Sequence, residues 1–289
     1  MINVIKNKYI FLTISGLLIA TSIFFITYFG LKTGIDFVGG VSWQIAFHDK
    51  LPTREEISKI FPDAVITPQG DNQYIIRLKD LSDADKRMKF EELLKNFGAL
   101  EELNFQNIGS VVGADLRNKA IWAFGLVLAA ISIYVAFAFR KVSQPVSSWK
   151  YGIITLVTLF HDALIPAGLY AILGRLFHAE VDTNFIVAIL VVMGFSVHDT
   201  IVVFDRIREN LRLSGEKSDF NNLVNNSVNQ TIARSINTSL TLVLTLVALL
   251  FLGPVPLQYF VLTILVGTVV GTYSSIFVAS PLLTLWRKK

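Results

Sequence analysis

Long runs of apolar residues constrain this chain more than any other feature of its sequence. Each run holds about 19 or more mostly apolar residues, enough for a helix to cross ~30 Å of hydrocarbon. Because lipid offers the backbone no hydrogen-bond partners, such runs fold as helices. The sequence therefore predicts a polytopic α-helical membrane protein with six transmembrane helices, at residues 9–29, 120–139, 151–173, 184–204, 235–253 and 257–285.

The positions of the basic residues predict the orientation of these helices. Hydrophobic residues make up 53% of the chain, and the Lys and Arg residues gather in alternate connections. Such residues concentrate on the cytoplasmic side, so both termini are expected there, and the first run is too long for the core of a signal peptide. The net charge of +4 is then a matter of topology and gives no reason to expect nucleic acid. The residues concerned are Lys6, Lys8, Arg140, Lys141, Lys150, Arg206, Arg208, Arg212, Lys217, Arg287, Lys288 and Lys289.

Residues 31–119 have nearly balanced charges and predict a small folded domain outside the membrane. Its patterns follow the order β-α-β-β-α-β, which is that of a ferredoxin-like α+β fold. The predicted organisation is thus 1–30 for the N-terminus and first helix, 31–119 for the extracytoplasmic domain and 120–289 for helices two to six. Such a domain is expected to contact something outside the membrane, the alternative being a passive spacer.

Turn and cap residues place the elements of this domain. "VSWQIAFH" alternates like a strand, and "AVITPQGDNQYIIRLK" predicts two strands around a Gly-Asp-Asn turn. One helix is expected after Thr53, with Glu56 in capping-box spacing, and a second runs from a Ser82 cap to Gly98. The last stretch, "ALEELNFQNIGSVVG", is expected to be β.

Two spans carry ionisable residues at membrane depth, where a charge costs several kcal/mol and indicates a functional site. Asp199 lies about two-thirds of the way along the fourth span, and His161 and Asp162 lie near the middle of the third. Pro166 follows them and is expected to bend that helix. The alternative for His161 and Asp162 is a structural role, in which they bond each other or a nearby backbone.

The fifth span has a polar stripe with a single cation, Arg234, which suggests a partner for Asp199. A guanidinium buried on this stripe needs a carboxylate, and Asp199 is the expected one; the alternative is that Arg234 snorkels to the cytoplasmic surface. A movable Arg234 would control the proton on Asp199, which would be released in the pair and bound on separation. The stripe consists of Ser227, Thr231, Arg234, Asn237, Thr238, Thr241 and Thr245.

Two further patterns concern packing. Small residues recur every four positions in the sixth span, at Gly267, Gly271, Ser275 and Ala279, as in helices that approach closely. "DRIRENLR", which begins at Asp205 and Arg206, is expected to be a solvated amphipathic segment on the cytoplasmic face.

Several of these stretches together resemble one family. "TGIDFVGG", "GFSVHDTIVVFDRIREN", "NQTIARSINTSL" and "GTYSSIFVASPLL" are similar to motifs of SecF, a protein-export membrane protein of the resistance-nodulation-division superfamily. The resemblance covers almost the whole chain. It implies a six-helix half that pairs with a SecD half in the inner membrane of a bacterium.

The resemblance also implies a function. SecD and SecF use the proton-motive force, or sodium in some relatives, to draw polypeptides outward beside the SecYEG channel after the SecA motor has acted. The partners implied are SecD, SecYEG and YajC, with SecA, the unfolded polypeptide and lipid. No covalent reaction, cofactor, metal or nucleic acid is implied.

The family's motifs fall on particular residues of this chain. Its intramembrane acid falls on Asp199 and its fifth-helix arginine on Arg234, and the full set expected to couple protons is Asp199, Arg234, His198, Thr200, Asp162 and His161. The motif residues expected to be structural are Gly34, Asp36, Gly39, Gly40, Asp205, Arg206, Asn237, Thr238, Gly267 and Gly271. The chain departs from the family at Val38, where Thr is usual, and at His198, where Asn is common. The sequence leaves open whether His198 relays protons or only donates a hydrogen bond.

Two other classes of function would each account for part of the sequence. An intramembrane divalent-cation carrier or metalloenzyme could use the pairs 161–162 and 198–199, but adjacent helical residues point about 100° apart, whereas ligand pairs usually sit at i and i+4. A passive assembly scaffold would explain the outer domain but not the stripe that bears Arg234.

Overall fold

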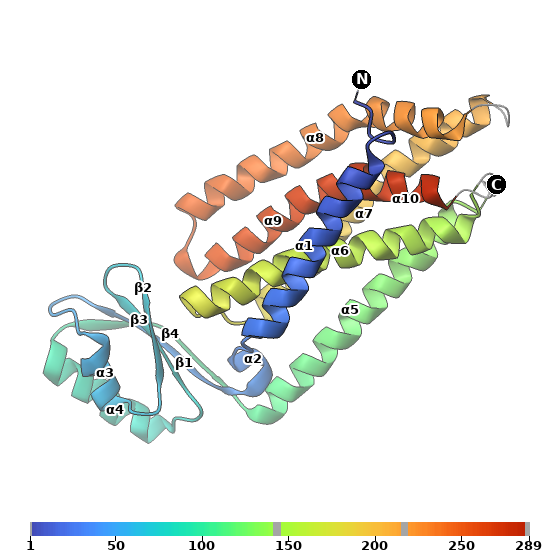
Figure 1. Ribbon diagram of the computed structural model, residues 1–289. Coiled ribbons are helices and arrows are strands. Elements are labelled where there is room, and N and C mark those ends of the chain that lie inside the picture. Colours follow the sequence, from blue (N-terminus) through green and yellow to red (C-terminus); the bar gives the residue numbers. More distant parts are fainter. Residues whose placement is uncertain (1, 141–145, 215–218, 287–289) are drawn as a thin grey trace. The chain divides into compact units, whose positions relative to one another are not determined.

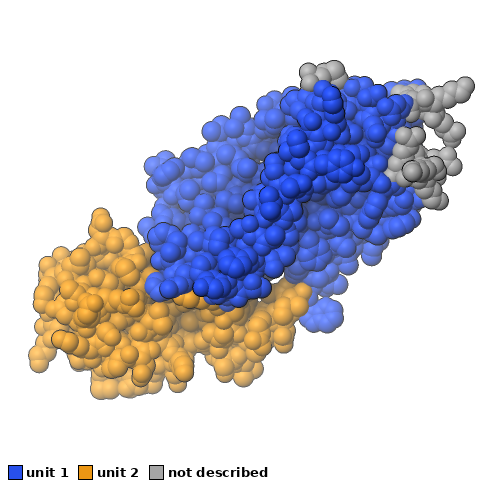
Figure 2. All heavy atoms as spheres, in the orientation of Figure 1, with its two compact units in different colours: residues 1–31, 122–179, 184–289 blue, residues 32–121, 180–183 orange. Residues whose placement is uncertain are grey.

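The computed structural model describes residues 2–140, 146–214 and 219–286. Within these ranges, six helices are long and apolar enough to cross a membrane, which confirms the predicted number. The chain divides into two compact units: unit 1 comprises Met1–Leu31, Trp122–Ala179 and Asn184–Lys289, and unit 2 comprises Lys32–Ile121 and Glu180–Thr183 (Figure 2). Lys141, Lys217, Arg287, Lys288 and Lys289, part of the predicted cytoplasmic charge pattern, lie outside the described residues.

Unit 2 has the predicted ferredoxin-like fold. Over its described residues, one antiparallel sheet of four strands has the order β2-β3-β1-β4. Two helices alternate with the strands, so the chain order is β-α-β-β-α-β (Figure 1). The elements are β1 (Gly40–Phe47), α3 (Arg54–Ile60), β2 (Val65–Gln69), β3 (Gln73–Leu78), α4 (Asp83–Phe97) and β4 (Leu100–Ile108).

The period of two along β1 produces the core of this unit. Trp43, Ile45 and Phe47 are buried and pack in one cluster with Ile57 of α3 and Leu93 of α4. Burial of each large apolar side chain contributes roughly 1.5–3 kcal/mol relative to exposure. One face of the sheet is thereby fixed against the two helices.

The helices of unit 2 begin at the predicted capping residues, and α4 ends at the predicted glycine. The amide of Glu56 donates to Oγ1 of Thr53 at 3.3 Å, and the Thr53 amide donates to Oε2 of Glu56 at 2.8 Å, which completes the predicted capping box. The Asp85 amide donates to the Ser82 hydroxyl at 3.1 Å. Gly98, with φ of 78°, ends α4.

The second span begins earlier than predicted. Residues 110–113 were expected to end the last strand, but α5 (Ser110–Ala138) starts there and continues into the membrane span. The reason is packing: this first turn lies against α2 (Ile35–Val38), and a Cβ on Gly113 would lie 2.8 Å from the amide nitrogen of Gly39. This tertiary contact overrides the β propensity of the two valines.

Unit 1 consists of the remaining spans, three of which are central. In the most apolar 18-residue stretch of each span, the buried share of the residues is 50% in α6, 44% in α7 and 56% in the sixth span. The same share is only 11–17% in α1, α5 and α8. The central helices therefore have room for polar groups away from lipid. The elements are α1 (Lys8–Phe29), α6 (Ser148–Phe177), α7 (Thr183–Ser214), α8 (Phe220–Leu252), a short 3₁₀ turn η1 (Val255–Leu257), α9 (Gln258–Ser274), the π-helical turn η2 (Ser275–Ala279) and α10 (Ser280–Leu285) (Figure 1).

The predicted amphipathic segment after the fourth span belongs to the same helix as that span. "DRIRENLR" is the continuation of α7, which ends at Ser214. Its polar side chains bond to the neighbouring helix: Nε of Arg206 donates to Oε1 of Gln230 at 2.6 Å, and the amide of Asn210 donates to Oγ of Ser227 at 2.8 Å. These contacts with α8 hold the last turns of α7.

A substitution of Gly39 tests the packing at the start of α5. Its φ is 79°, and a Cβ there would lie 2.7 Å from Cα of Ser110. We expect Gly39→Ala to lower the free energy of unfolding by about 2 kcal/mol or more, through backbone strain and overpacking. Thermal unfolding of the purified chain in detergent measures this loss.

Gly109→Ala is the matched control, because a Cβ at Gly109 meets nothing within 4 Å. Equal midpoints for the two variants would contradict the proposed close approach.

Candidate functional site

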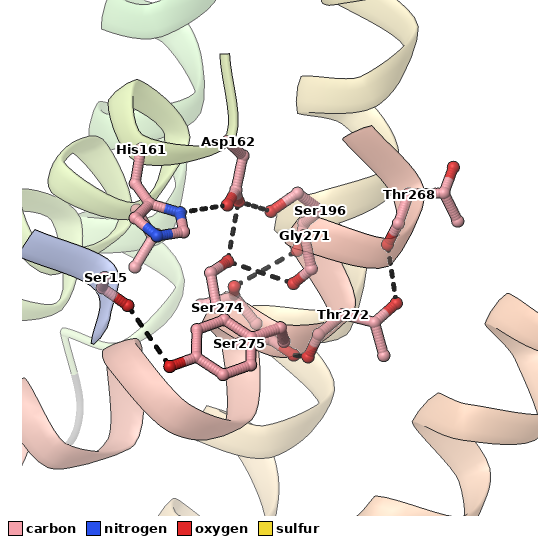
Figure 3. Close-up of polar contacts among 12 residues, drawn as sticks. Ser15, His161, Asp162, Ser196, Thr268, Gly271, Thr272, Ser274 and Ser275 are labelled. Atoms are coloured by element: carbon pink, nitrogen blue, oxygen red, sulfur yellow. Dashed lines mark hydrogen bonds and ion pairs between the residues drawn. The ribbon is translucent and has the colours of Figure 1, made fainter. Parts of the chain in front are cut away.

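Asp162 of α6 lies at the centre of a polar cluster in unit 1. Its side chain is fully buried, and Oδ2 accepts hydrogen bonds from the hydroxyls of Ser196 on α7 and Ser274 on α9, the latter at 2.7 Å. Figure 3 shows the carboxyl group of Asp162 directed toward both serines. Three different helices thus meet at one carboxyl group.

His161 completes the surroundings of this acid. Its Nδ1 lies 2.8 Å from Oδ1 of Asp162, and its ring stacks on Tyr273 with centroids 6.5 Å apart. Nε2 of His161 is buried and has no hydrogen-bond partner among the described residues. The two residues therefore bond each other, as the structural alternative supposed, and form a pair that can share or exchange a proton.

Asp199 of α7 is the second buried acid, with 2% of its surface exposed. The hydroxyl of Ser239 on α8 lies 3.4 Å from its Oδ2 and 2.5 Å from the hydroxyl of Thr272 on α9. The Thr272 hydroxyl in turn donates to the carbonyl of Thr268 at 2.9 Å. Asp199 is thus linked through Ser239 to α9, the helix that also contacts Asp162.

Arg234 does not contact Asp199 in this structure. The predicted polar stripe is divided between two faces of α8: Ser227 and Thr231 are buried, whereas Arg234 and the rest of the stripe are exposed. No ion pair of Arg234 occurs within the described parts of the chain. The hydroxyl of Ser239, not the predicted guanidinium, reaches the acid because residues 227, 231, 235 and 239 share the inner face of the helix.

The neighbours of Asp199 on α7 differ in their surroundings. Thr200 is fully buried, and its hydroxyl donates to the carbonyl of Ser196 at 3.2 Å. His198 is exposed on the surface of the chain. Adjacent helical residues point about 100° apart, so His198 and Asp199 do not share a face.

Gly267 and Gly271 lie where α9 approaches α7. A Cβ on Gly267 would collide with the side chain of Val192, and a Cβ on Gly271 would lie 2.9 Å from Cβ of Ser196. Small residues at these positions bring Ser196 of α7 close enough to share Asp162 with Ser274.

The motif "TGIDFVGG", residues 33–40, follows the first helix and lies within unit 2. The amide and hydroxyl of Thr183, the first residue of α7, donate to Oδ2 of Asp36 at 2.9 and 2.6 Å. The Gly34 amide donates to the carbonyl of Val181 at 2.8 Å, and Gly40 has a φ of 132°. The motif therefore caps the start of α7 with a carboxylate, where the helix dipole favours negative charge.

A second charged contact holds the same connection. Nε of Arg77 on β3 lies 3.1 Å from Oε2 of Glu180. Burial raises the pKa of Glu180, as does the charge of Asp182, while the positive charges of Arg77 and Lys32 oppose this shift. The 180–183 connection is thus anchored to the sheet of unit 2 as well as to Asp36.

The remaining motif residues lie on helix surfaces. Asp205 is exposed and forms an ion pair with Arg208 one turn further along α7. Arg206 pairs with Glu209 at 2.6 Å, in addition to its bond to α8. Asn237 and Thr238 belong to the exposed face of α8.

Sequence reasoning missed four hydroxyl residues that contact or link the acids. Ser196, Ser239, Thr272 and Ser274 are small polar residues, and such residues are common in membrane helices. A signal was present for Ser196, which lies three residues before Asp199 and therefore close to its face of α7. Nothing in the sequence indicates that Ser274 meets Asp162.

Metal ligation has no geometric support in the described ranges. No group of three or more His, Asp or Glu side chains there is arranged so that it could hold a metal ion. The two His-Asp pairs thus lend no weight to the alternative of a divalent-cation carrier.

These features define a polytopic helical membrane protein with two buried acids in its bundle and an α+β unit between its first two spans. Residues 89–289 match the family described as protein export membrane protein SecD/SecF, C-terminal. The protein translocase subunit SecF of Thermobaculum terrenum is 42% identical over 306 aligned positions, covering 100% of this chain and 95% of the relative. That of Anaerolinea thermophila is 36% identical, with 99% and 94% covered.

A solved structure gives the same result. The crystal structure of SecDF, a translocon-associated membrane protein from Thermus thermophilus, superposes with a TM-score of 0.86 at 34% identity, over 99% of this chain and 38% of the larger one. The chain therefore belongs to the SecF family of protein-export membrane proteins.

The buried cluster yields a stability prediction. Asp162→Ala removes the acceptor of Ser196 and Ser274 and leaves His161 without its partner, so we expect a loss of ~3–5 kcal/mol in the free energy of unfolding. Asp205→Ala, which removes an exposed ion pair, should cost about 0–1 kcal/mol. Thermal unfolding in detergent compares the two, and equal losses would show that the Asp162 contacts do not stabilise the bundle.

Proposed function

We propose that this chain acts with a SecD partner to promote the export of polypeptides across the cytoplasmic membrane of a bacterium, driven by the proton-motive force. It would act beside the SecYEG channel after SecA, with YajC as an accessory partner, and would catalyse no covalent reaction itself. Family membership supports the role in translocation. The 35% identical Thermus thermophilus relative, named protein translocase subunit SecDF, is matched over 35% of its length, which supports a SecD partner.

The exposed face of α8 is the observation that carries the proposal. Arg234 lies on it near the middle of the helix, beside the exposed apolar residues Ile236, Leu240 and Leu244. Arg234 directly precedes the predicted span 235–253, and the cost of an arginine rises toward the centre of a bilayer, where it reaches about 2.5–3.5 kcal/mol, so such a residue faces protein or water rather than lipid. We infer that the SecD partner covers this face.

Helix α8 can link this interface to the proton. Its inner face reaches Asp199 through Ser239, while Arg234 lies on the outer face. These positions differ by five residues, or roughly 140° around the helix axis. A partial turn of α8, together with the length of an arginine side chain, would bring the guanidinium to Asp199.

The two arrangements would bind the proton differently. A buried carboxylate is unfavourable unless a cation pairs with it or a proton neutralises it. Pairing with Arg234 would release the proton of Asp199, and separation, as in this structure, would let it bind. Alternating exposure of Asp199 to the two sides would turn this exchange into a transport cycle. We propose that His198, Thr200, His161 and Asp162 assist the same exchange.

The outer domain would contact the emerging polypeptide. Helices α3 and α4 cover only one face of its sheet, and the other face presents side chains of alternate residues such as Ser42, Ile75 and Thr67. An extended chain could bind weakly there. The alternative role as a spacer predicts no such binding.

The topology can be tested directly because the chain has no cysteine. Lys50 is exposed in unit 2, and Leu213 is 77% exposed at the end of α7. With both termini cytoplasmic, Lys50→Cys should react from outside with an impermeant thiol reagent, and Leu213→Cys should react only after the cells are opened. Labelling of Leu213→Cys in intact cells would overturn the topology.

Energy coupling is tested at Asp199 and Arg234. Asp199→Asn should fold but abolish the acceleration of export by a pH gradient, and Arg234→Ala should do the same by leaving Asp199 protonated. Arg234→Lys should not restore coupling, because a buried lysine can lose its proton. The measurement is export and proton flux in vesicles that contain SecD and SecYEG, with and without an imposed gradient.

Two matched variants separate these effects from general damage. Asp205→Asn removes an exposed acid of the same helix, and Thr245→Val alters the same face of α8; both should keep the response to the gradient. If Asp199→Asn responds like the wild type, the acid is structural and the mechanism is wrong.

A further inference from the structure

Ser274 has one proton and two acceptors for it. Its hydroxyl lies 2.7 Å from Oδ2 of Asp162 and 3.1 Å from the carbonyl oxygen of Gly271, one turn back on α9. A serine hydroxyl can donate only one hydrogen bond at a time. Which of the two bonds forms therefore depends on whether Oδ2 of Asp162 accepts or donates a hydrogen bond.

The protonation state of Asp162 decides between them. An ionised carboxylate only accepts, so both Ser196 and Ser274 can donate to Oδ2. A proton on Oδ2 becomes a donor, and the serine that accepts it must direct its own hydroxyl elsewhere. Within the described residues only Ser274 has a second acceptor, the Gly271 carbonyl.

We propose that Asp162 is a second proton-binding acid of the membrane unit and that Ser274 transmits its protonation state to the backbone of α9. Binding of a proton to Oδ2 forms the O–H group that donates to Oγ of Ser274. The Ser274 hydroxyl then rotates from Oδ2 to the carbonyl of Gly271. No group other than the incoming proton is required.

The Gly271 carbonyl lies next to the point where the backbone geometry of α9 changes. It already accepts the amide of Ser275, and α9 ends at Ser274, where the π-helical turn η2 begins. Hydroxyl bonds to the carbonyl one turn back bend helices, and π-turns occur frequently at functional sites. Protonation of Asp162 thus alters α9 at the point where its geometry changes.

The same stretch of α9 is linked to the other acid. Thr272 contacts Ser239, which reaches Asp199, and the Thr272 hydroxyl has the carbonyl of Thr268 as its own backbone acceptor. Two residues of α9, Thr272 and Ser274, therefore connect its backbone to the two acids. Figure 3 shows the bond of Ser274 to Asp162 and that of Thr272 to Thr268. The backbone of α9 can therefore respond to the protonation states of both Asp162 and Asp199.

Few other ionisable groups surround Asp162. Helix α1, which packs against α6, has Lys8 at its start, bonded to Thr284, and Tyr9 exposed beside it. Helix α10 and the turn η2 bring no charged side chain to the cluster over the described residues. The groups to be controlled in a titration are His161 on α6, Tyr273 on α9, and His198 and Asp199 on α7.

The biological role of this switch rests on the proton cycle proposed above, but its test needs no export. The full-length chain in lipid nanodiscs, carrying Asp199→Asn to silence the other acid, is titrated and followed by infrared difference spectroscopy. Because Glu180 and the exposed carboxyl groups also bind protons as the pH falls, the chain is compared with its Asp162→Asn variant, and the difference between the two should contain the band of one protonated carboxyl group that is missing in Asp162→Asn. Persistence of the band in Asp162→Asn, or its absence throughout, would overturn the assignment.

Spin labels then report on α9. Val269→Cys and Leu285→Cys are exposed positions on either side of η2, and the distance between labels there should change over the same pH range. Asp162→Asn and Ser274→Ala should abolish this change. A change that survives in either variant would contradict the proposal.

Two neighbouring serines provide matched controls. Among the residues that the structure describes, Ser196 contacts Asp162 but has no backbone acceptor on α9, and Ser275 donates to the Thr272 carbonyl at 2.9 Å without contacting an acid. Ser196→Ala and Ser275→Ala should both keep the change in distance. If either abolishes it as completely as Ser274→Ala, the response reflects general loosening of the helices rather than transmission by Ser274.

Discussion

Removal of a carboxyl group from water is the constraint that organises the membrane unit. Asp162 is fully buried, and a carboxyl group in a medium of low dielectric must be hydrogen-bonded, paired or protonated. Its donors come from α6, α7 and α9, which are also the three most buried spans. The close approach at Gly267 and Gly271 serves the same end, because larger residues would separate Ser196 from the acid it stabilises.

The hydroxyl contacts give α9 a position unlike that of the other spans. Helix α6 holds one acid, α7 holds the other, and α8 presents the arginine, but α9 bears no charge and touches both acid clusters. Hydroxyl groups suit this role because they can donate or accept as the partner requires. A helix without acidic or basic residues can thus respond to protons bound on its neighbours.

The sequence was sufficient for the fold but for only half of the site. Apolar runs and cap residues such as Thr53 predict spans and helices correctly, since they depend on local periodicity. The start of α5 and the inward turn of Ser239 depend on contacts between distant segments, which periodicity cannot show. The stripe on α8 failed as a single face because the buried side of this helix turns about the helix axis: the buried residues 227, 231, 235 and 239 are spaced by four, and each such step advances by about 40°. Asp199 and Asp162 were found because a charge in a membrane span is costly wherever it lies.

The exposed arginine of α8 also affects the stability of the chain before it assembles with a partner. A copy inserted without the proposed partner would present Arg234 on an uncovered face and would be less stable in the bilayer for that reason. Unassembled copies would then be preferred substrates for membrane proteases, since degradation follows the population of loosened states. A polar face of this kind would keep the amounts of the two halves matched without any dedicated regulator.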